Sequence, residues 1–391
     1  MFTRKIEINS IFSKNPDFSA FFILGPRQTG KSFLIKHSAL EKIWYINLLA
    51  TDIFQEFTLR PYKLREHFRA MKNDIDLIII DEIQKVPTLL DEVHLLLEEE
   101  SVKFILTGSS ARKLKKQSVN LLGGRALQMI FHPLTYPEII SDSEFDLARI
   151  LSFGTLPKIY NAKTPEKMLK SYCSTYLKEE IANESLTRNL PSFARFLEVA
   201  ANCNGEILNY SKIANDAQVP KTTVIEYFSI LEDTLIAKKI PPFLYTQKRK
   251  PLETPKFYFF DVGVVRRLAG FSIGLDPSLN NAGKEFETYI YHELATYIDY
   301  QALNCEIRYW RTASQHLEVD FIIDTKVAIE VKLSKHIQEN DLKGLKALKE
   351  EKIVDRTIVV SRESQKRIVD GIEIYPCNEF LKELWDSEII N

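Results

Sequence analysis

Residues 25–32 of the chain read Gly25-Pro26-Arg27-Gln28-Thr29-Gly30-Lys31-Ser32. The stretch matches the pattern G-x-x-x-x-G-K-[ST] at every fixed position. The apolar and aromatic run before it, 18–24, is typical of a β-strand, and the residues after it, 33–36, are typical of the start of a helix. A strand, this loop and a helix in succession form the setting in which the pattern binds phosphate groups. The sequence therefore predicts a phosphate-binding loop, here called the P-loop, at 25–32.

Each part of the P-loop has an expected role in holding a nucleoside triphosphate. The backbone N–H groups of the loop and of the following helix would surround the β-phosphate. Lys31 would reach the β- and γ-phosphates, and the hydroxyl of Ser32 would be a ligand of Mg²⁺. We therefore expect ATP and Mg²⁺ as cofactors of this part of the chain.

The composition of the 391 residues limits the class of protein. Hydrophobic residues make up 45% and charged residues 27%, which is ordinary for a soluble globular protein of two or three domains. The net charge is −1, so any contact with nucleic acid must use local patches. The four cysteines have no metal-type spacing, and no signal peptide or membrane-length apolar segment is found. We expect a soluble cytoplasmic protein without a membrane partner.

A second strand, expected at 76–80, ends in the acidic pair Asp81 and Glu82. Its continuous apolarity is typical of a central strand of a parallel sheet that is covered on both faces. Ligands of such sheets bind at the carboxyl ends of the strands, where the two acids fall. Asp81 would hold the Mg²⁺ shell, mostly through water, and Glu82 would polarise the water that attacks the γ-phosphate.

Two further residues are candidates for catalysis. Ser109 follows a strand expected at 102–106, and its hydroxyl would touch the γ-phosphate or the attacking water, or cap a helix. Arg125 follows a pair of glycines and would stabilise charge on the γ-phosphate, in the same chain or from a neighbouring subunit of a homo-oligomer. An ordinary surface arginine is the alternative for Arg125.

The middle of the chain predicts a helical region and a winged helix. Residues 138–200 have helical periodicity and few strand signals. In 201–255 two short helices flank a turn at 218–220, and wing strands are expected to begin near residue 235. This order of elements is typical of a helix-turn-helix with a wing.

The second of these helices, from Lys221, could enter a major groove of DNA. Thr222, Thr223 and Glu226 would share its outer face with Lys221. The acid and the scarcity of basic residues leave DNA contact and a purely structural or protein-binding role both open. The basic run 248–250 is the best local candidate for contacts with phosphate groups.

The C-terminal part predicts a second chemical site. A hairpin around the three-residue loop 324–326 would place Asp320 opposite Glu330 and Glu318 opposite Lys332. Because alternate residues of a strand share one face, Glu330 and Lys332 would lie together. Carboxylates and an ammonium group would then converge, although a charged hairpin face with a Glu–Lys pair is the plain alternative.

The N-terminal motifs resemble one known family. The motifs are the P-loop, the segment 81–84, the segment 107–110, the Gly124-Arg125 pair and the segment 131–134. Together they resemble the prokaryotic AAA-type ATPases that carry a C-terminal domain of unknown function. The resemblance implies a P-loop ATPase core with Glu82 as the catalytic glutamate and a polar sensor on the strand of Ser109. Arg125 matches the Gly-Arg motif of that family.

The C-terminal hairpin resembles the PD-(D/E)XK nuclease-like fold. The resemblance implies that Asp320 and Glu330 bind Mg²⁺ and that Lys332 positions or activates a water molecule. Glu287 matches the acid that many members carry on their first helix. Related domains fused to ATPases bind nucleic acid or cut it, and the short signature does not distinguish the two.

The expected fold class is α/β, with four segments. They are a P-loop AAA-type core with a parallel sheet at 1–137, a helical lid at 138–200, a winged helix at 201–255 and a restriction-endonuclease-like α/β domain at 256–391. The leading hypothesis is an ATP-hydrolysing switch that controls a DNA-directed C-terminal module. The alternatives are an ATP-gated, metal-dependent DNA nuclease and a nucleotide-dependent protein-binding scaffold.

Overall fold

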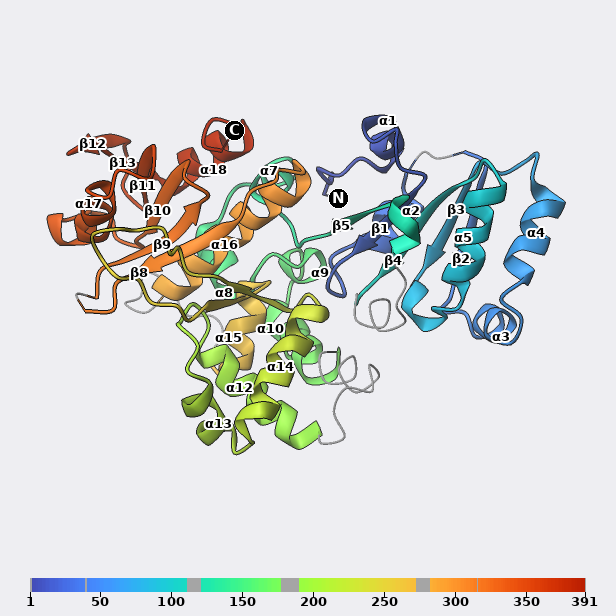
Figure 1. The fold of residues 1–391 in the computed structure, drawn as a ribbon, viewed down its shortest axis with the longest axis horizontal. Coiled ribbons are helices and arrows are strands. Elements are labelled where there is room, and N and C mark those ends of the chain that lie inside the picture. The colour runs from blue at the N-terminus through green and yellow to red at the C-terminus, as the bar shows by residue number, and fades with distance from the viewer. Residues whose placement is uncertain are drawn as a thin grey trace. The chain divides into compact units, whose positions relative to one another are not determined.

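The computed structural model describes residues 2–38, 41–110, 121–176, 190–271, 282–314 and 316–390. They form two compact units (Figure 1). The N-terminal unit contains Arg4–Pro133 together with Asp233–Ile236. The C-terminal unit contains Met1–Thr3, Leu134–Glu232 and Ala237–Asn391. The helical, winged-helix and nuclease-like segments expected from the sequence therefore fall almost entirely in one unit.

The N-terminal unit is built on a parallel sheet of five strands. In chain order they are β1 (Ala20–Leu24), β2 (Ile43–Asn47), β3 (Leu77–Asp81), β4 (Lys103–Gly108) and β5 (Ala126–Ile130). Their order in the sheet is β2-β3-β4-β1-β5, and every neighbouring pair is parallel. The predicted parallel sheet is confirmed. All five residues of β1 and of β3 are buried, as expected for strands with both faces covered.

Helices supply the apolar cover of this sheet. They are α1 (Ile11–Lys14), α2 (Lys31–Lys36), α3 (Thr51–Leu59), α4 (Lys63–Met71) and α5 (Leu89–Glu99), with short 3₁₀ turns at Ile8–Ser10, Ile83–Lys85 and Leu121–Gly124. In α5, the residues Leu89, Val93 and Leu96 recur at helical spacing and are buried in the same core as Ile78 and Phe104 of the sheet.

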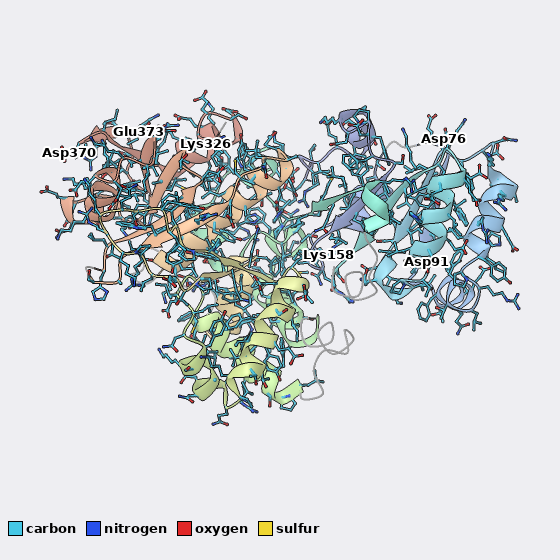
Figure 2. The ribbon with its side chains drawn as sticks, in the orientation of Figure 1. Asp76, Asp91, Lys158, Lys326, Asp370 and Glu373 are labelled. Atoms are coloured by element: carbon cyan, nitrogen blue, oxygen red, sulfur yellow. The ribbon has the colours of Figure 1, made fainter. Side chains whose placement is uncertain are left out.

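The two ends of β3 differ in burial, and this difference indicates which edge of the sheet carries the expected phosphate site. Asp76, just before the strand, is exposed and forms an ion pair with Lys42 at 3.7 Å (Figure 2). Asp81, at the carboxyl end, is 2% exposed. Leu24 at the end of β1 pairs with Gly108 at the end of β4. The carboxyl edge of the sheet therefore carries the P-loop, Asp81 and the residues after β4.

The C-terminal unit contains the remaining helices. They are α7 (Tyr136–Ile140), α8 (Leu147–Phe153), α9 (Pro157–Tyr160), α10 (Pro165–Ser171), α12 (Leu190–Asn202), α13 (Tyr210–Ala217), α14 (Lys221–Asp233), α15 (Val262–Leu268), α16 (Gly283–Tyr300), α17 (Lys343–Lys349) and α18 (Cys377–Trp385). Short π-helical and 3₁₀ turns lie at Tyr172–Tyr176 and Glu339–Leu342. Among the described residues, no helix is both long and apolar enough to cross a membrane.

A two-stranded sheet follows the helix-turn-helix elements. Helices α13 and α14 flank the turn at 218–220, and the strands β6 (Ala237–Ile240) and β7 (Lys256–Phe259) pair antiparallel. Phe228 of α14 packs against Phe257 of β7, with ring centroids 4.7 Å apart. The odd-numbered residues of β7 therefore face α14, and its even-numbered residues face the other way.

A mixed sheet of six strands forms the last layer. The strands are β8 (Ile307–Arg311), β9 (Glu318–Ile323), β10 (Val327–Val331), β11 (Arg356–Ser361), β12 (Arg367–Val369) and β13 (Ile372–Pro376), in the order β12-β13-β11-β10-β9-β8. Phe321 and Ile329 belong to the core formed with α16, whereas Ile322 and Ala328 belong to the core formed with α17. This alternation buries both faces of the sheet.

The predicted hairpin register is confirmed. Val327 pairs with Ile323 and Ile329 pairs with Phe321, which leaves the three-residue loop 324–326. The same register places Asp320 opposite Glu330, and the carboxylate Oδ2 of Asp320 accepts a hydrogen bond from the backbone N–H of Val331 at 2.9 Å.

Candidate functional site

Two glycines of the P-loop are required by the backbone. A Cβ atom on Gly25 would lie 2.2 Å from the carbonyl oxygen of Phe131, because the loop passes close to the end of β5. Gly30 has a φ of +103°, which side chains other than hydrogen rarely tolerate. Gln28 also has a positive φ, of 63°. The loop between β1 and α2 is therefore held in the tightly curled form that the motif predicts.

Arg4 contacts the P-loop beside the end of β5. Arg4 was not predicted as a site residue. Its Nη1 donates a hydrogen bond to the carbonyl oxygen of Thr29 at 2.6 Å, and its Nη2 donates one to the carbonyl oxygen of His132 at 2.7 Å. Its guanidinium also stacks 4.1 Å from the ring centroid of Phe131. Arg4 thus ties the loop to the segment after β5.

Lys31 is buried against the loop itself. Its Nζ donates hydrogen bonds to the carbonyl oxygens of Gly25 at 2.6 Å and Pro26 at 2.9 Å. The side chain of Thr29 donates to Pro26 as well, at 2.9 Å. In these contacts the ammonium is held by neutral carbonyl dipoles, which a phosphate oxygen can replace with a stronger, charge-assisted bond. Ser32 follows on α2 and is half-buried.

Asp81 is positioned by two hydroxyl groups. Tyr45, on β2, donates a hydrogen bond to its Oδ2 at 2.7 Å, and Thr107, on β4, donates one to its Oδ1. Burial and the bond to Asp81 raise the pKa of Tyr45 well above its usual range. Asp81 is therefore oriented by neutral donors, and its carboxylate retains lone pairs for a metal-bound water.

Glu82 is connected to the strand of Ser109 through Gln84. The amide Nε2 of Gln84 donates hydrogen bonds both to the carboxylate of Glu82 and to the Oγ of Ser109, the latter at 3.0 Å. Glu82 has a φ of +64°, and its backbone N–H donates to the hydroxyl of Thr107 at 3.2 Å. Because β4 lies between β1 and β3, Ser109 lies beside both the P-loop strand and the acidic strand.

Arg125 does not join these residues. It lies just before β5, where its carbonyl oxygen accepts a hydrogen bond from the N–H of Ala20 at 3.3 Å. Its guanidinium forms an exposed ion pair with Glu98 at 3.0 Å. This is the amino edge of the sheet, about 13 Å along β1 from the P-loop at ~3.3 Å per residue. Arg125 therefore lies apart from the P-loop of its own chain in this structure, and its role at the γ-phosphate, in the same chain or from a neighbouring subunit, stays a prediction.

The donor set at the P-loop suits Mg²⁺ bound with a nucleotide. Ser32 offers a hydroxyl and Asp81 a carboxylate, which are the oxygen ligands that Mg²⁺ prefers. In the part of the chain that the structure describes, no group of three or more His, Cys, Asp or Glu side chains is arranged to hold a metal ion by itself. The phosphate oxygens of a nucleotide would complete the shell.

The carboxylates of the C-terminal module converge, but on a lysine. The Nζ of Lys256, from β7, lies 3.1 Å from Glu287, 2.5 Å from Glu318 and 3.5 Å from Asp320. Lys256 is 2% exposed. Tyr258, two residues further along β7, donates a hydrogen bond to the same oxygen of Glu287. Neither Lys256 nor Tyr258 was predicted as a site residue.

Lys332 and Glu330 form the second half of this cluster. The Nζ of Lys332 donates to Oε1 of Glu330 at 2.5 Å, whereas Oε2 of Glu330 is buried and has no hydrogen-bond partner among the described residues. Burial, with the charge of Asp320, raises the pKa of Glu330 well above its usual range and that of Glu287 to about 7. Burial disfavours the charge of Lys256, yet the carboxylates, Glu287 foremost, hold its pKa well above its ordinary value.

This cluster does not fit a divalent metal ion. The ammonium of Lys256 already lies among three of the carboxylates, at the distances of ion pairs. A metal ion in the same place would meet a buried like charge. The residues predicted as metal ligands, Glu287, Asp320 and Glu330, are thus brought together with Lys332, but around an internal cation.

The residues predicted to contact nucleic acid lie on α14 and in the run 248–250. Lys221, Thr222 and Glu226 are exposed on α14. In the basic run 248–250, Arg249 forms ion pairs with Glu350 at 2.6 Å and Glu351 at 3.4 Å. The middle residue of that run is therefore neutralised within the chain, which weakens the run as a phosphate site.

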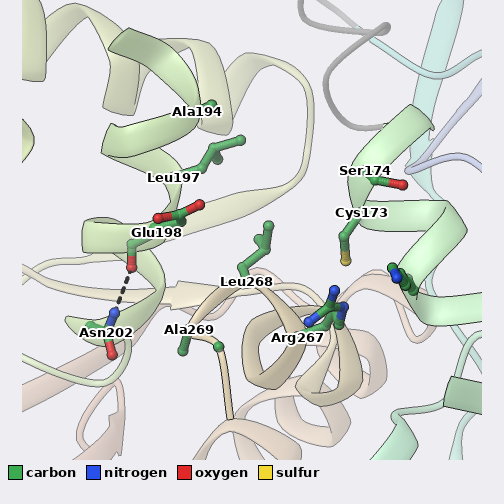
Figure 3. A pocket seen from close by; sticks show the side chains of 11 residues that line it. Cys173, Ser174, Ala194, Leu197, Glu198, Asn202, Arg267, Leu268 and Ala269 are labelled. Carbon is green, nitrogen blue, oxygen red and sulfur yellow. Dashed lines mark hydrogen bonds between the residues drawn. The ribbon is translucent and has the colours of Figure 1, made fainter. Parts of the chain in front are cut away.

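A separate pocket of about 320 Å³ lies among the helices of the C-terminal unit (Figure 3). Lys170 and Arg267 line it together with Cys173. Burial raises the pKa of the Cys173 thiol to about 12, so the thiol is neutral near pH 7 and a poor nucleophile. The pocket offers no reactive group comparable with the P-loop.

Three family models match different parts of the chain. Residues 17–140 match the AAA domain, residues 144–274 match a domain of unknown function (DUF8612) and residues 282–380 match a domain of unknown function (DUF4143). The first match covers the five-stranded sheet and all the P-loop site residues described above except Arg4.

Two proteins that are similar over most of this chain are described as uncharacterized. An uncharacterized protein of Mycobacterium tuberculosis is 25% identical over 311 residues, which are 77% of this chain and 67% of that protein. An uncharacterized protein of Methanocaldococcus jannaschii is 23% identical over 367 residues, 85% of this chain and 79% of that protein.

Among solved structures, domain III of the replication initiation protein DnaA from Thermotoga maritima is similar, at 14% sequence identity. The likeness covers 46% of this chain and 83% of that one, with a TM-score of 0.26. A TM-score of this size is too low to bear on fold or function. The match of residues 17–140 to the AAA domain supports an AAA-type P-loop ATPase in this part of the chain.

Proposed function

We propose that the N-terminal unit binds ATP and hydrolyses it, and that its nucleotide state controls the C-terminal unit. The observation that carries the first part is the position of Lys31, whose ammonium rests on the carbonyl oxygens of its own loop. Asp81 is the last residue of β3, and Glu82 follows it. In the sheet, β4 lies between β3 and the P-loop strand β1. The match of 17–140 to the AAA domain supports the same activity.

In this mechanism Lys31 exchanges carbonyl oxygens for the β- and γ-phosphate oxygens of ATP. Ser32 and Asp81 would hold Mg²⁺, which would supply positive charge to the phosphate oxygens. Glu82 accepts a hydrogen bond from the attacking water and takes its proton as the water oxygen bonds to the γ-phosphorus. Ser109 donates a hydrogen bond to the γ-phosphate, and the bridging oxygen leaves with ADP.

The test is ATP binding and turnover in the full-length chain with Mg²⁺. We expect Lys31→Ala to weaken ATP binding at least a hundred-fold, because the charge-assisted contacts to two phosphates are lost. Lys14→Ala, which removes an exposed lysine paired with Glu7, serves as the matched control. Retained ATP affinity in Lys31→Ala would remove the proposal.

A loop of the N-terminal unit supports nucleotide control of the rest of the chain. The segment Asp233–Ile236 connects α14 to β6, yet it belongs to the N-terminal unit. The Oγ of Ser110 donates to the carbonyl oxygen of Asp233 at 3.5 Å, and Leu235 packs against the core of the five-stranded sheet. A shift of Ser109 on γ-phosphate binding would reach Ser110 and, through its hydrogen bond, Asp233 of the same unit.

The proposed target of the C-terminal unit is DNA, contacted through α14. The exposed Lys221 and Thr222 at its start support this, although Glu226 on the same face limits the affinity. The test is anisotropy of a labelled duplex with the full-length protein, with and without ATP, across a range of salt. We expect binding that weakens with salt, and further weakening in Lys221→Ala.

Salt-independent binding, or none with either nucleotide state, would contradict a DNA target. It would favour the scaffold hypothesis, in which the same surfaces contact protein. Cleavage of DNA is not part of the proposal, because Lys256 occupies the carboxylate cluster.

A further inference from the structure

The carboxylate cluster of the C-terminal module contains its own cation. Three carboxylates lie within 3.5 Å of one ammonium nitrogen, that of Lys256. The cluster as a whole sets four acids against three bases: Glu287, Glu318, Asp320 and Glu330 against Lys256, Lys332 and Arg311. The ammonium of Lys256 therefore already holds the position in which three of these carboxylates would meet a metal ion.

The backbone fixes Lys256 in this position. Lys256 begins β7 and pairs with Ile240 of β6, and it also forms a bridge with Ile207. On the opposite side of the strand, Phe257 packs against Phe228 of α14. The backbone that carries Lys256 is therefore held on both sides of the strand.

The surroundings of the ammonium also favour a monovalent cation. Tyr309 presents its ring 5.6 Å from the Nζ of Lys256, within the range of a cation–π contact. Tyr258 satisfies the oxygen of Glu287 that faces the lysine. The cluster is thus completed by an ammonium, an aromatic face and a phenol, all from this chain.

We infer that the ammonium of Lys256 takes the place of a divalent cation in this cluster, so that the C-terminal module binds no Mg²⁺ there and does not cut nucleic acid by a metal-dependent route. The lysine comes from the two-stranded sheet beside the helix-turn-helix, and the acids come from α16 and β9. The cluster therefore joins these parts of the C-terminal unit instead of serving as a catalytic centre. This inference does not depend on the proposed ATPase activity.

The first arm of the test measures Mn²⁺ binding to the nucleotide-free, full-length protein by electron paramagnetic resonance. Wild type and Asp320→Asn should give the same binding curve, because no metal occupies the cluster. Asparagine keeps a carbonyl oxygen that can accept the hydrogen bond from Val331. A Mn²⁺ site present in wild type and lost in Asp320→Asn would overturn the inference.

The second arm removes the internal cation. Lys256→Ala should bind Mn²⁺ at the cluster at least ten-fold more tightly than wild type does. The double variant, Lys256→Ala with Asp320→Asn, should not have this site. Lys284→Ala, which removes an exposed lysine paired with Glu206, should gain no site. A folded Lys256→Ala protein without a new site would contradict the inference.

Should Lys256→Ala fail to fold, the comparison of wild type with Asp320→Asn still decides. Incubation with single- and double-stranded DNA, Mn²⁺ and ATP adds an independent readout. Equal behaviour of wild type and Asp320→Asn supports the inference, and cleavage by wild type that Asp320→Asn lacks overturns it.

Discussion

The P-loop site and the carboxylate cluster both hold buried charges, but with different partners. Lys31 rests on two backbone carbonyls, and Asp81 accepts hydrogen bonds from two hydroxyls. Lys256, in contrast, lies among three carboxylates. The two carbonyl oxygens that accept from Lys31 can be exchanged for phosphate oxygens, which form stronger charge-assisted bonds, whereas the ion pairs of Lys256 satisfy its charge within the chain.

The P-loop site and the carboxylate cluster both contain acidic residues, but their buried lysines have different partners. At the P-loop, a phosphate oxygen that displaces a carbonyl gains a charge-assisted bond to Lys31. At the cluster, a metal ion would have to displace an ammonium held by strands on both sides. Breaking such a buried pair leaves uncompensated charge, which costs about 3–5 kcal/mol. We propose that the first site receives an external ligand and that the second joins parts of the C-terminal unit.

The largest expected effect is on catalysis by Glu82. Glu82→Gln should lower the turnover of ATP by about a hundred- to ten-thousand-fold while ATP binding is kept, because the amide cannot take the proton of the attacking water. Steady-state hydrolysis and equilibrium nucleotide binding measure the two quantities separately. Glu66→Gln, at an exposed position of α4, is the control. Normal turnover in Glu82→Gln would break the assignment of the N-terminal site.

A buried acid that pairs with no ammonium group among the described residues sharpens the comparison. Glu293 of α16 is 0% exposed and accepts hydrogen bonds from the backbone N–H of Tyr136 at 2.7 Å and from Nε1 of Trp385 at 2.8 Å. Burial raises its pKa from 4.5 to about 8. Because the folded chain binds this proton more tightly than the unfolded chain, the stabilisation is complete below pH 4.5 and lost as the pH rises through about 8.

We therefore expect the free energy of unfolding of the C-terminal unit to fall by on the order of 2 to 3 kcal/mol from Glu293 alone between about pH 5 and pH 8. Glu293→Gln should remove this part of the slope, and Glu144→Gln, at an exposed position, should not. Urea midpoints across the pH range measure the effect. If the free energy of unfolding depends on pH in Glu293→Gln as it does in wild type, burial without a counter-charge does not set the pKa of Glu293.

A smaller effect is expected at Gln84, which connects Glu82 with Ser109. Gln84→Ala should lower the turnover of ATP about three- to ten-fold and leave ATP affinity within two-fold, because it removes a positioning contact and no ligand of the nucleotide. Lys85→Ala, at the exposed neighbouring position, is the control. An equal loss in binding would mean that Gln84 acts on the shape of the P-loop instead.

Local patterns of the sequence predicted much of this arrangement. The P-loop with its strand and helix was predicted because the fixed glycines and the flanking apolar runs lie within a few residues of one another. The hairpin register was predicted because strand alternation and a three-residue loop leave one pairing. The two helices on either side of the turn at 218–220 were predicted from the turn and from the apolar spacing around it.

The missed residues depend on distant contacts. Lys256 begins an aromatic strand, and the acids Glu287 and Asp320 that surround it come 31 and 64 residues later. Arg4 reaches Thr29 and His132, which are 25 and 128 residues away. The position of Arg125 depends on which edge of the sheet it occupies, and the order of strands decides that. No local pattern carries this information.

The most direct test of the contrast between the two sites is the number of Mn²⁺ ions bound per chain with a non-hydrolysable ATP analogue. The account predicts one Mn²⁺ per chain with the analogue, lost in Lys31→Ala and kept in Asp320→Asn. The contrary result would be a Mn²⁺ ion that binds Lys31→Ala in the absence of nucleotide and does not bind Asp320→Asn. It would contradict the contrast between the two sites.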